Sequence, residues 1–196
     1  MSTRVIATAR LNATCRHKLC GQFGLSVDPA SELNRLSCII GSSQLTLPGL
    51  RQLISTASAT SVLNTLAPAE FGRVLAHMES GSRSALEKTA ADLQTELAET
   101  LTVATAVVTA ATRDITATTI AESGLGLGYT VTTHPGETTT CIELRRGHEV
   151  VLVRVHNDGG LEFDHSGLTG DTCGEHQLQL ERAAKRYGVS IARPRQ

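Results

Sequence analysis

A single long apolar row constrains this chain more than any other feature of its sequence. Between Ser84 and Ile120, apolar residues recur at spacings of three and four, which is typical of one face of an amphipathic helix. The row consists of Leu86, Ala90, Leu93, Leu97, Leu101, Ala104, Val108, Ala111 and Ile115. At about 1.5 Å per residue, such a helix is roughly 55 Å long. We therefore predict one long helix over residues 83–122, and the sequence leaves open whether it continues through Gly81.

The second half of this predicted helix is almost free of charge. No Asp, Glu, Lys or Arg occurs between Glu99 and Arg113, and a second apolar row lies beside the first. Because few faces of this half suit water, we expect burial on two sides, partly by a protein partner or by another copy of the chain. The residues predicted to bind that partner are Leu97, Leu101, Val103, Ala104, Val107, Val108, Ala111 and Ile115.

The composition argues against a general nucleic-acid binder. The 196 residues suffice for one domain or two small ones with a stable core. There is no Trp, and three Phe and two Tyr offer little aromatic surface on which bases can stack. The formal net charge of −1 is also unlike that of a polyanion binder. One basic set keeps a nucleic-acid accessory role open as an alternative: Arg182, Lys185, Arg186, Arg193 and Arg195.

The sequence contains no evident targeting segment or membrane span. Residues 4–14 lack the continuous apolar stretch of a secretory signal. The least polar run, residues 101–112, falls well short of the roughly 20 residues that span a bilayer. The five cysteines are odd in number and irregular in spacing, which predicts reduced thiols rather than a disulfide framework. We therefore expect a cytoplasmic protein without a membrane partner.

Cap and turn signals before the long helix predict mostly short helices. Residues 5–11 alternate as a short strand does, and a coil is the other interpretation. Pro29, Pro48 and Pro68 each mark the first turn of a predicted helix, since proline is favoured at the first helical position. A Ser-Gly-Ser break at residues 80–82 then precedes the long helix.

Beyond residue 122, the pattern changes from helical to strand-like. Three glycines predict a flexible hinge over residues 123–128. Four alternating segments then predict antiparallel strands at 129–133, 141–145, 149–156 and 161–164. The segment 149–156 is apolar on both faces, which predicts a central strand. A helix that ends near Gly188 and a last short strand at 189–192 follow.

The predicted fold class is therefore α+β, in two parts. Residues 1–122 form a helical unit that includes the long helix, and residues 123–128 form the glycine-rich hinge. Residues 129–196 form a small antiparallel sheet with a packed C-terminal helix.

The segment after the predicted hinge resembles a known family. Strand and turn residues carry this likeness: Leu127–Val131, Ile142–Arg145, Gly160-Leu161 and Gly167–Gly170, followed by a final helix. In these motifs the C-terminal part is similar to a small uncharacterised family of conserved reading frames of plastids, cyanobacteria and other bacteria. The resemblance supports the predicted sheet and helix. It implies no activity, because none is established for that family.

One polar set near the C-terminus has the composition of a catalytic site. His165, Cys173 and His176 fall within a predicted strand, loop and helix. A Cys and His pair is the minimum for thiol catalysis, and the same residue types bind metals. A third group that would orient the pair is not visible in the sequence, so a structural role is the alternative.

A second polar set lies near the N-terminus. Cys15, His17, Cys20 and Cys38 could supply thiolate and imidazole ligands to zinc, although their spacing matches no common zinc module. The alternative is structural, since free cysteine is among the most often buried residue types.

Together these patterns predict a non-catalytic adaptor or assembly subunit that binds a protein partner or itself through the long helix. The second hypothesis is a small metal- or thiol-dependent enzyme that uses the His165, Cys173 and His176 set. The third is a nucleic-acid accessory protein with a basic C-terminal tail. No cofactor is predicted.

Overall fold

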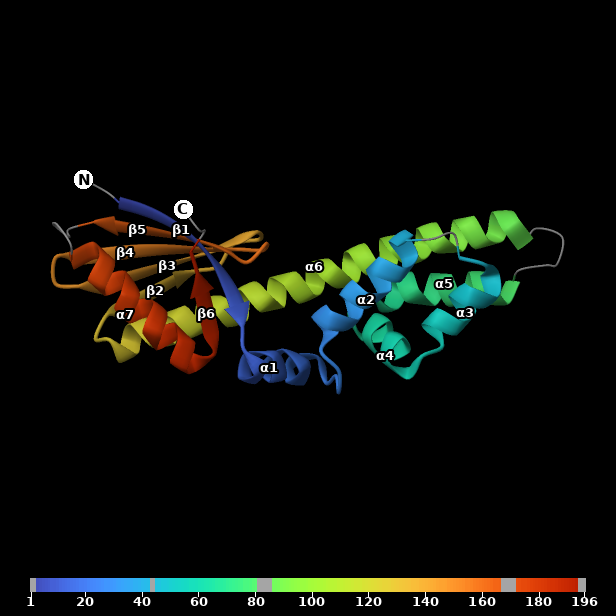
Figure 1. Cartoon of the computed structure of the whole chain (residues 1–196), viewed down its shortest axis with the longest axis horizontal. Coiled ribbons are helices and arrows are strands. Elements are labelled where there is room, and N and C mark those ends of the chain that lie inside the picture. The colour runs from blue at the N-terminus through green and yellow to red at the C-terminus, as the bar shows by residue number, and fades with distance from the viewer. Residues whose placement is uncertain (1–2, 43–44, 81–85, 167–171, 194–196) are drawn as a thin grey trace. The chain divides into compact units, whose positions relative to one another are not determined.

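The computed structural model describes residues 3–42, 45–80, 86–166 and 172–193, and it divides into two compact units. Unit 1 comprises Met1–Leu19 and Thr109–Gln196, and unit 2 comprises Cys20–Val108. The long helix α6, Leu86–Gly126, belongs to both, because the boundary at residue 108 falls within it (Figure 1).

The chain has an α+β arrangement, as predicted: one strand, six helices, four strands, a seventh helix and a last strand follow one another in the described residues. The described helices are α1 (Ala13–Phe23), α2 (Pro29–Ser42), α3 (Leu47–Ile54), α4 (Ala57–Leu66), α5 (Pro68–Ser80), α6 (Leu86–Gly126) and α7 (Thr172–Tyr187). The described strands are β1 (Thr3–Leu11), β2 (Thr130–His134), β3 (Thr139–Arg146), β4 (Glu149–His156), β5 (Gly160–Ser166) and β6 (Val189–Ala192).

In unit 1, the described strands form one six-stranded sheet in the order β2-β3-β4-β5-β1-β6. All neighbouring pairs are antiparallel. The strand β4 lies inside the sheet between β3 and β5, which confirms the prediction of a central strand. Ile142 lies opposite Val153, and Val153 lies opposite Phe163, so neighbouring strands present their apolar residues to the same face.

The inner face of this sheet carries the core of unit 1. The buried cluster consists of Ala7, Ala117, Ile120, Tyr129, Ile142, Leu144, Val151, Val153, Val155, Leu161, Phe163 and Leu180. It therefore joins β1, β3, β4 and β5 to α7 and to the last turns of α6, which lie on one side of the sheet (Figure 1). Burial of a Val, Leu or Phe side chain contributes about 1.5–3 kcal/mol, so this cluster is the main source of stability for unit 1.

Unit 2 is helical. Helix α4 packs against α2, α3 and α5, and α6 runs alongside α2 and α5 (Figure 1). Two side-chain contacts join α6 to these neighbours. The Gln94 amide donates to the Ile40 carbonyl of α2 at 2.8 Å, and Glu96 lies 3.0 Å from the His77 ring of α5.

The chain itself covers more of the apolar row of α6 than we expected from the sequence. Five of the eight residues predicted to bind a partner are buried: Leu97, Leu101, Ala104, Val108 and Ala111. Ile115 is half-buried, whereas Val103 and Val107 remain exposed. The prediction underestimated the cover because the sequence pattern showed fewer short helices than the chain forms.

The predicted hinge at residues 123–128 is wrong over most of its length, because α6 continues to Gly126. A Cβ atom at Gly124 would lie 2.6 Å from Leu144 Cδ2, so this glycine permits close packing of the helix on β3. The helix then ends in a Schellman motif. Gly128 has a φ of +83° and donates to the Leu125 carbonyl, while the Tyr129 amide donates to the Gly124 carbonyl.

The two units do not divide where the sequence predicted. The alternating segment near the N-terminus is a strand, and β1 lies between β5 and β6 in the sheet of unit 1. The first eleven residues of the chain therefore do not belong to the helical unit over residues 1–122 that the sequence had predicted. Sequence periodicity could indicate a strand there, but it carried no information on strand partners about 150 residues away.

Other elements confirm or extend the predicted boundaries. Helix α2 begins at Pro29, and the Ala30 amide in its first turn donates to Oδ1 of the N-cap residue Asp28 at 3.2 Å. The helix predicted from Pro48 is in fact two helices, α3 and α4. Helix α1 was not predicted. The predicted break at residues 81–82 and the predicted start of the long helix at residue 83 lie outside the described residues.

Candidate functional site

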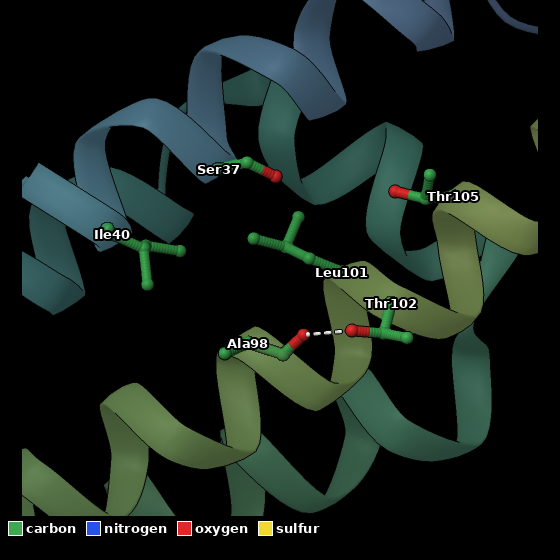
Figure 2. Close-up of a pocket in the computed structure, with 7 residues that line it drawn as sticks. Ser37, Ile40, Ala98, Leu101, Thr102 and Thr105 are labelled. Atoms are coloured by element: carbon green, nitrogen blue, oxygen red, sulfur yellow. Dashed lines mark hydrogen bonds between the residues drawn. The ribbon is translucent and has the colours of Figure 1, made fainter.

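A groove lies between α2 and α6 in unit 2. It has a volume of about 330 Å³. Its walls are Ser37, Ile40 and Gly41 of α2 and Ala98, Leu101, Thr102 and Thr105 of α6. The Leu101 side chain lies between the two helices at the floor, as Figure 2 shows. A Cβ atom at Gly41 would meet no atom within 4 Å, so the α2 wall is open at that position.

No charged side chain contributes to the walls named above, and most of the lining residues are small. The Thr102 hydroxyl donates to the Ala98 carbonyl of its own helix at 3.0 Å (Figure 2). Its hydrogen-bonding need is therefore met within α6. The groove consequently offers mostly aliphatic contact, with room for a third element to approach two helices closely.

The same stretch of α6 carries exposed, uncharged residues around the helix, and two of them, Thr102 and Thr105, line the groove. We call Thr102, Val103, Thr105, Ala106 and Val107 the α6 uncharged face, because all five are exposed and none carries charge. Val103 is 39% exposed and Val107 is 37% exposed. These two are the only members of the predicted partner-binding set that the described part of the chain leaves exposed.

A polar cluster occupies a different place, in unit 1, where β2 begins and β3 turns into β4. The Arg146 guanidinium lies over the Tyr129 ring, 4.7 Å from its centroid. It also donates to Glu149 at 3.1 Å and to the Leu127 carbonyl at 3.2 Å. His176 of α7 completes the cluster, because the Tyr129 hydroxyl lies 2.8 Å from its Nδ1.

The contacts of His176 define its tautomer. Arg146 Nη2 lies 3.0 Å from His176 Nδ1, and a guanidinium can only donate. Nδ1 is therefore the acceptor, and the ring proton is assigned to Nε2, which lies 3.5 Å from a Glu149 oxygen. Burial raises the pKa of the Tyr129 hydroxyl, so Tyr129 keeps its proton. The cluster thus fastens α7 to the β3–β4 turn.

His165 lies beside this cluster on β5, beneath α7. Its side chain is 1% exposed, and neither ring nitrogen has a hydrogen-bond partner of good geometry among the described residues. Its ring stacks on that of Phe163, with centroids 6.5 Å apart. Burial lowers the pKa of His165, and His176 lowers it further, whereas Asp164 and the nearby Gln177 amide oppose the shift. His165 is therefore neutral at pH 7.

The predicted catalytic set is brought together only in part. His165 and His176 lie close enough to influence each other electrostatically. The side chain of Cys173 lies outside the described residues. His165 is closed off from solvent, and His176 is engaged by Tyr129 and Arg146. In the described part of the site, both imidazoles lie at the joint between α7 and the sheet.

The described residues of the predicted zinc set have different neighbours within their own units. Cys15 is buried and donates to the Tyr187 carbonyl at 3.4 Å, while Cys20 donates to the Val27 carbonyl at 3.4 Å. His17 and Cys38 are exposed on α1 and α2. Within the described ranges, no three His, Cys, Asp or Glu side chains are placed to hold a metal ion. The spacing along the chain could not reveal that these residues point to different neighbours.

The basic C-terminal set is partly assembled. Arg182, Lys185 and Arg186 are exposed on one side of α7, because they are three and four residues apart. Arg193 is paired with Glu181 at 2.9 Å, and Arg195 lies outside the described residues. The set therefore offers three free-standing cations on one helix in the described part of the tail.

Sequence reasoning missed Tyr129, Arg146 and Glu149 as members of the polar cluster. The spacing of Arg146 and Glu149 at i and i+3 across a turn was a weak signal of an ion pair. Tyr129 and His176 are 47 residues apart, and only the folded sheet brings them together.

No known protein-family model matches the chain, and no curated protein matches it at a significant level. The resemblance of the C-terminal part to the plastid and cyanobacterial family therefore stays a prediction. Among the described residues, no helix has both the length and the apolar character needed to cross a bilayer.

Proposed function

We propose that this protein is a non-catalytic adaptor or assembly subunit that binds a helical segment of a protein partner in unit 2. The bound segment would lie in the groove between α2 and α6 and contact Thr102 and Thr105 of the α6 uncharged face. The single observation that carries this proposal is the open groove between α2 and α6, whose named walls carry no charge.

The chemistry of the groove favours an amphipathic helix as the occupant. Two parallel or antiparallel helices leave a furrow into which the side-chain ridges of a third helix fit. The small residues Ser37, Gly41 and Ala98 would let that helix approach closely. Leu101 and Ile40 would supply aliphatic contact at the floor. The absence of charge from these walls favours an apolar ridge of Leu, Ile, Val or Met over an acidic or basic segment.

The test introduces charge into the groove without disturbing the core of unit 2. Ala98 is exposed on α6, so Ala98→Glu should fold normally and place a carboxylate against the bound helix. We expect it to lower the recovery of a stoichiometric partner from native lysate at least tenfold, measured by quantitative mass spectrometry of a tagged pull-down.

Ala76→Glu provides the matched control. Ala76 is also an exposed alanine on a helix of unit 2, but it lies on α5 and does not line the groove. The control should keep the partner. Equal recovery with both variants, or recovery of the wild-type chain without any stoichiometric partner, would contradict the proposal.

A further inference from the structure

Two imidazoles lie where the first turns of α7 meet the sheet of unit 1. His176 is the fifth residue of α7, and His165 lies beneath the helix on β5. The two rings are close enough that His176 disfavours a proton on His165. Tyr129 and Arg146 contact His176 Nδ1, and Glu149 lies near Nε2. We call these five residues the α7 joint.

The surroundings of His165 are largely apolar. Val151 lies opposite it on β4, and the Phe163 ring stacks on its ring from the same strand. The side chain is 1% exposed, and neither ring nitrogen has a hydrogen-bond partner of good geometry among the described residues. A proton added to this ring would therefore place a charge in an apolar site without a hydrogen bond. This burial is the main cause of the lowered pKa of His165.

His176 is held through its unprotonated nitrogen. Arg146 Nη2 lies 3.0 Å from Nδ1, and the Tyr129 hydroxyl lies 2.8 Å from the same atom. Because Nε2 carries the ring proton, a second proton on this ring would sit on Nδ1 and point towards Arg146. A guanidinium can only donate, so the proton would replace a hydrogen bond with repulsion between two cations.

The acidic groups closest to the two rings offset this repulsion only in part. Glu149 lies 3.5 Å from His176 Nε2, but its other carboxylate oxygen already accepts from Arg146 at 3.1 Å. Asp164 favours a charge on His165 from the same strand, yet burial of the ring outweighs it, since the pKa of His165 remains lowered.

The other charged groups on α7 and on the β3–β4 turn add little. Glu181 of α7 accepts from the Gln177 amide and is paired with Arg193. Glu175 of α7 and His148 of the turn are exposed, so water and salt screen their charges. The joint is therefore suited to two neutral imidazoles and poorly suited to two charged ones.

We propose that the α7 joint is an acid-sensitive latch, which releases the first turns of α7 from the sheet in mild acid while the strands stay paired. The release is local, because the contacts at the far end of the helix do not depend on either imidazole. Leu180 and Ala184 are buried in apolar clusters, and the Tyr187 carbonyl accepts from the Cys15 thiol at 3.4 Å. Opening of one weakly held segment ahead of the core is common in proteins.

The sign of the effect follows from where a proton binds better. In the open joint, the His165 ring faces water, whereas in the closed joint it does not. As the pH falls below about 6.5, the open joint takes up a proton that the closed joint disfavours, and opening becomes easier by at most about tenfold per pH unit. This inference concerns unit 1 and does not depend on the groove proposed for unit 2.

Hydrogen exchange of the full chain at pH 7.5 and pH 5.0 tests the latch, after correction for the intrinsic pH dependence of amide exchange. The amides of residues 176–181 bond to carbonyls in the first turns of α7, so they should exchange at least about fivefold faster at pH 5.0. The amides of β3 and β4 should change by less than about twofold. Equal acceleration in α7 and in these strands, or no acceleration in α7, would overturn the proposal.

A double variant, His165→Leu with His176→Gln, assigns the response to the two imidazoles. Leu keeps an apolar side chain against Phe163, and Gln keeps an acceptor for Arg146. Residues 176–181 of this variant should exchange equally at the two pH values. His134→Gln is the matched control, because it removes an exposed imidazole of unit 1 on β2 and should respond as the wild type does.

The single variant His176→Gln keeps the test decisive if the double variant is already unprotected at pH 7.5. It leaves His165 in place and should reduce the acid response of residues 176–181 at least about twofold, because the cation facing Arg146 can no longer form. A wild-type acid response in the double variant, or in His176→Gln where the double variant is unprotected, would overturn the proposal, since another group would then control the opening.

Discussion

At the scale of single residues, the joint between α7 and the sheet depends on an imidazole that must remain neutral. His165 is buried, and within the described ranges its ring nitrogens meet no hydrogen-bond partner of good geometry. Asp164 on the same strand would stabilise a positive charge on His165, whereas His176 of α7 would destabilise it. Arg146 and Glu149 lie beyond His176 and largely neutralise each other. Gln177 approaches from α7, and its amide already bonds Glu181.

This arrangement predicts a loss of stability in mild acid. Because the pKa of His165 is lowered in the folded state, the unfolded chain binds the proton first as the pH falls below about 6.5. The contribution of His165 to the free energy of unfolding should therefore be constant above pH 7. Below pH 6.5 it should decrease, by at most about 1.4 kcal/mol per pH unit.

Urea denaturation followed by circular dichroism at pH 7.5 and pH 5.0 checks this prediction. His165→Leu removes the titrating group and keeps an apolar side chain against Phe163, so it should show a smaller loss between the two pH values than the wild type does. The same pH dependence in both proteins would show that His165 is not responsible.

A second residue-scale prediction concerns Gly124. Replacement of a helical glycine by alanine ordinarily stabilises a helix by about 1 kcal/mol. At Gly124, however, the added Cβ would lie 2.6 Å from Leu144 Cδ2 and 3.4 Å from Val131, and Leu144 is fully buried. Overpacking of a core costs about 1–3 kcal/mol, so Gly124→Ala should lower the free energy of unfolding on balance.

Gly126→Ala is the matched control for Gly124→Ala. A Cβ atom at Gly126 would meet the hydroxyl of Tyr187 at 3.3 Å, and Tyr187 is 43% exposed and free to move aside. This variant should be neutral or more stable in urea denaturation. Equal urea midpoints for the two variants would mean that α6 has room to shift away from β3.

At the scale of elements, the sequence revealed those segments whose pattern is local. Strands β3, β4 and β5 alternate cleanly because one face of each is buried and the other is not. Helix α1 was missed because only Cys15 and Leu19 face a core, which leaves no apolar stripe to recognise. The end of α6 was missed because three glycines signal a turn in sequence, whereas Gly124 serves close packing in the fold.

In the candidate sites, too, the sequence revealed only what depends on neighbouring residues along the chain. The charge-free stretch of α6 could be predicted directly from the sequence. The residues that bury it could not, because hydrophobic periodicity does not show how the other helices pack against α6. Of the polar cluster and its neighbour His165, the sequence indicated only His165 and His176, as part of a concentration of polar residues near α7. It could not indicate Tyr129 or Arg146, since only the antiparallel register sets them beside His176.

At the scale of the whole molecule, the sheet of unit 1 is assembled from both ends of the chain. β1 contributes Ala7 to the core and supplies the ladder for both β5 and β6. Unit 2 lies between these segments in sequence and has its own buried residues, among them Leu36, Leu63 and Phe71. Each unit is therefore expected to lose its structure separately when its own core is disrupted.

Ala7→Asp tests this expectation, because it places a carboxylate in the core of unit 1 at a residue that is 1% exposed. An unpaired buried charge costs several kcal/mol, so hydrogen exchange should show strong loss of protection in β1, β5, β6 and α7. Helices α2 to α5 should keep theirs. Thr8→Asp, one residue further on the exposed face of β1, should leave both units protected. Equal loss of protection in α2 to α5 of Ala7→Asp would instead show that α6, which both units share, couples them into one cooperative structure.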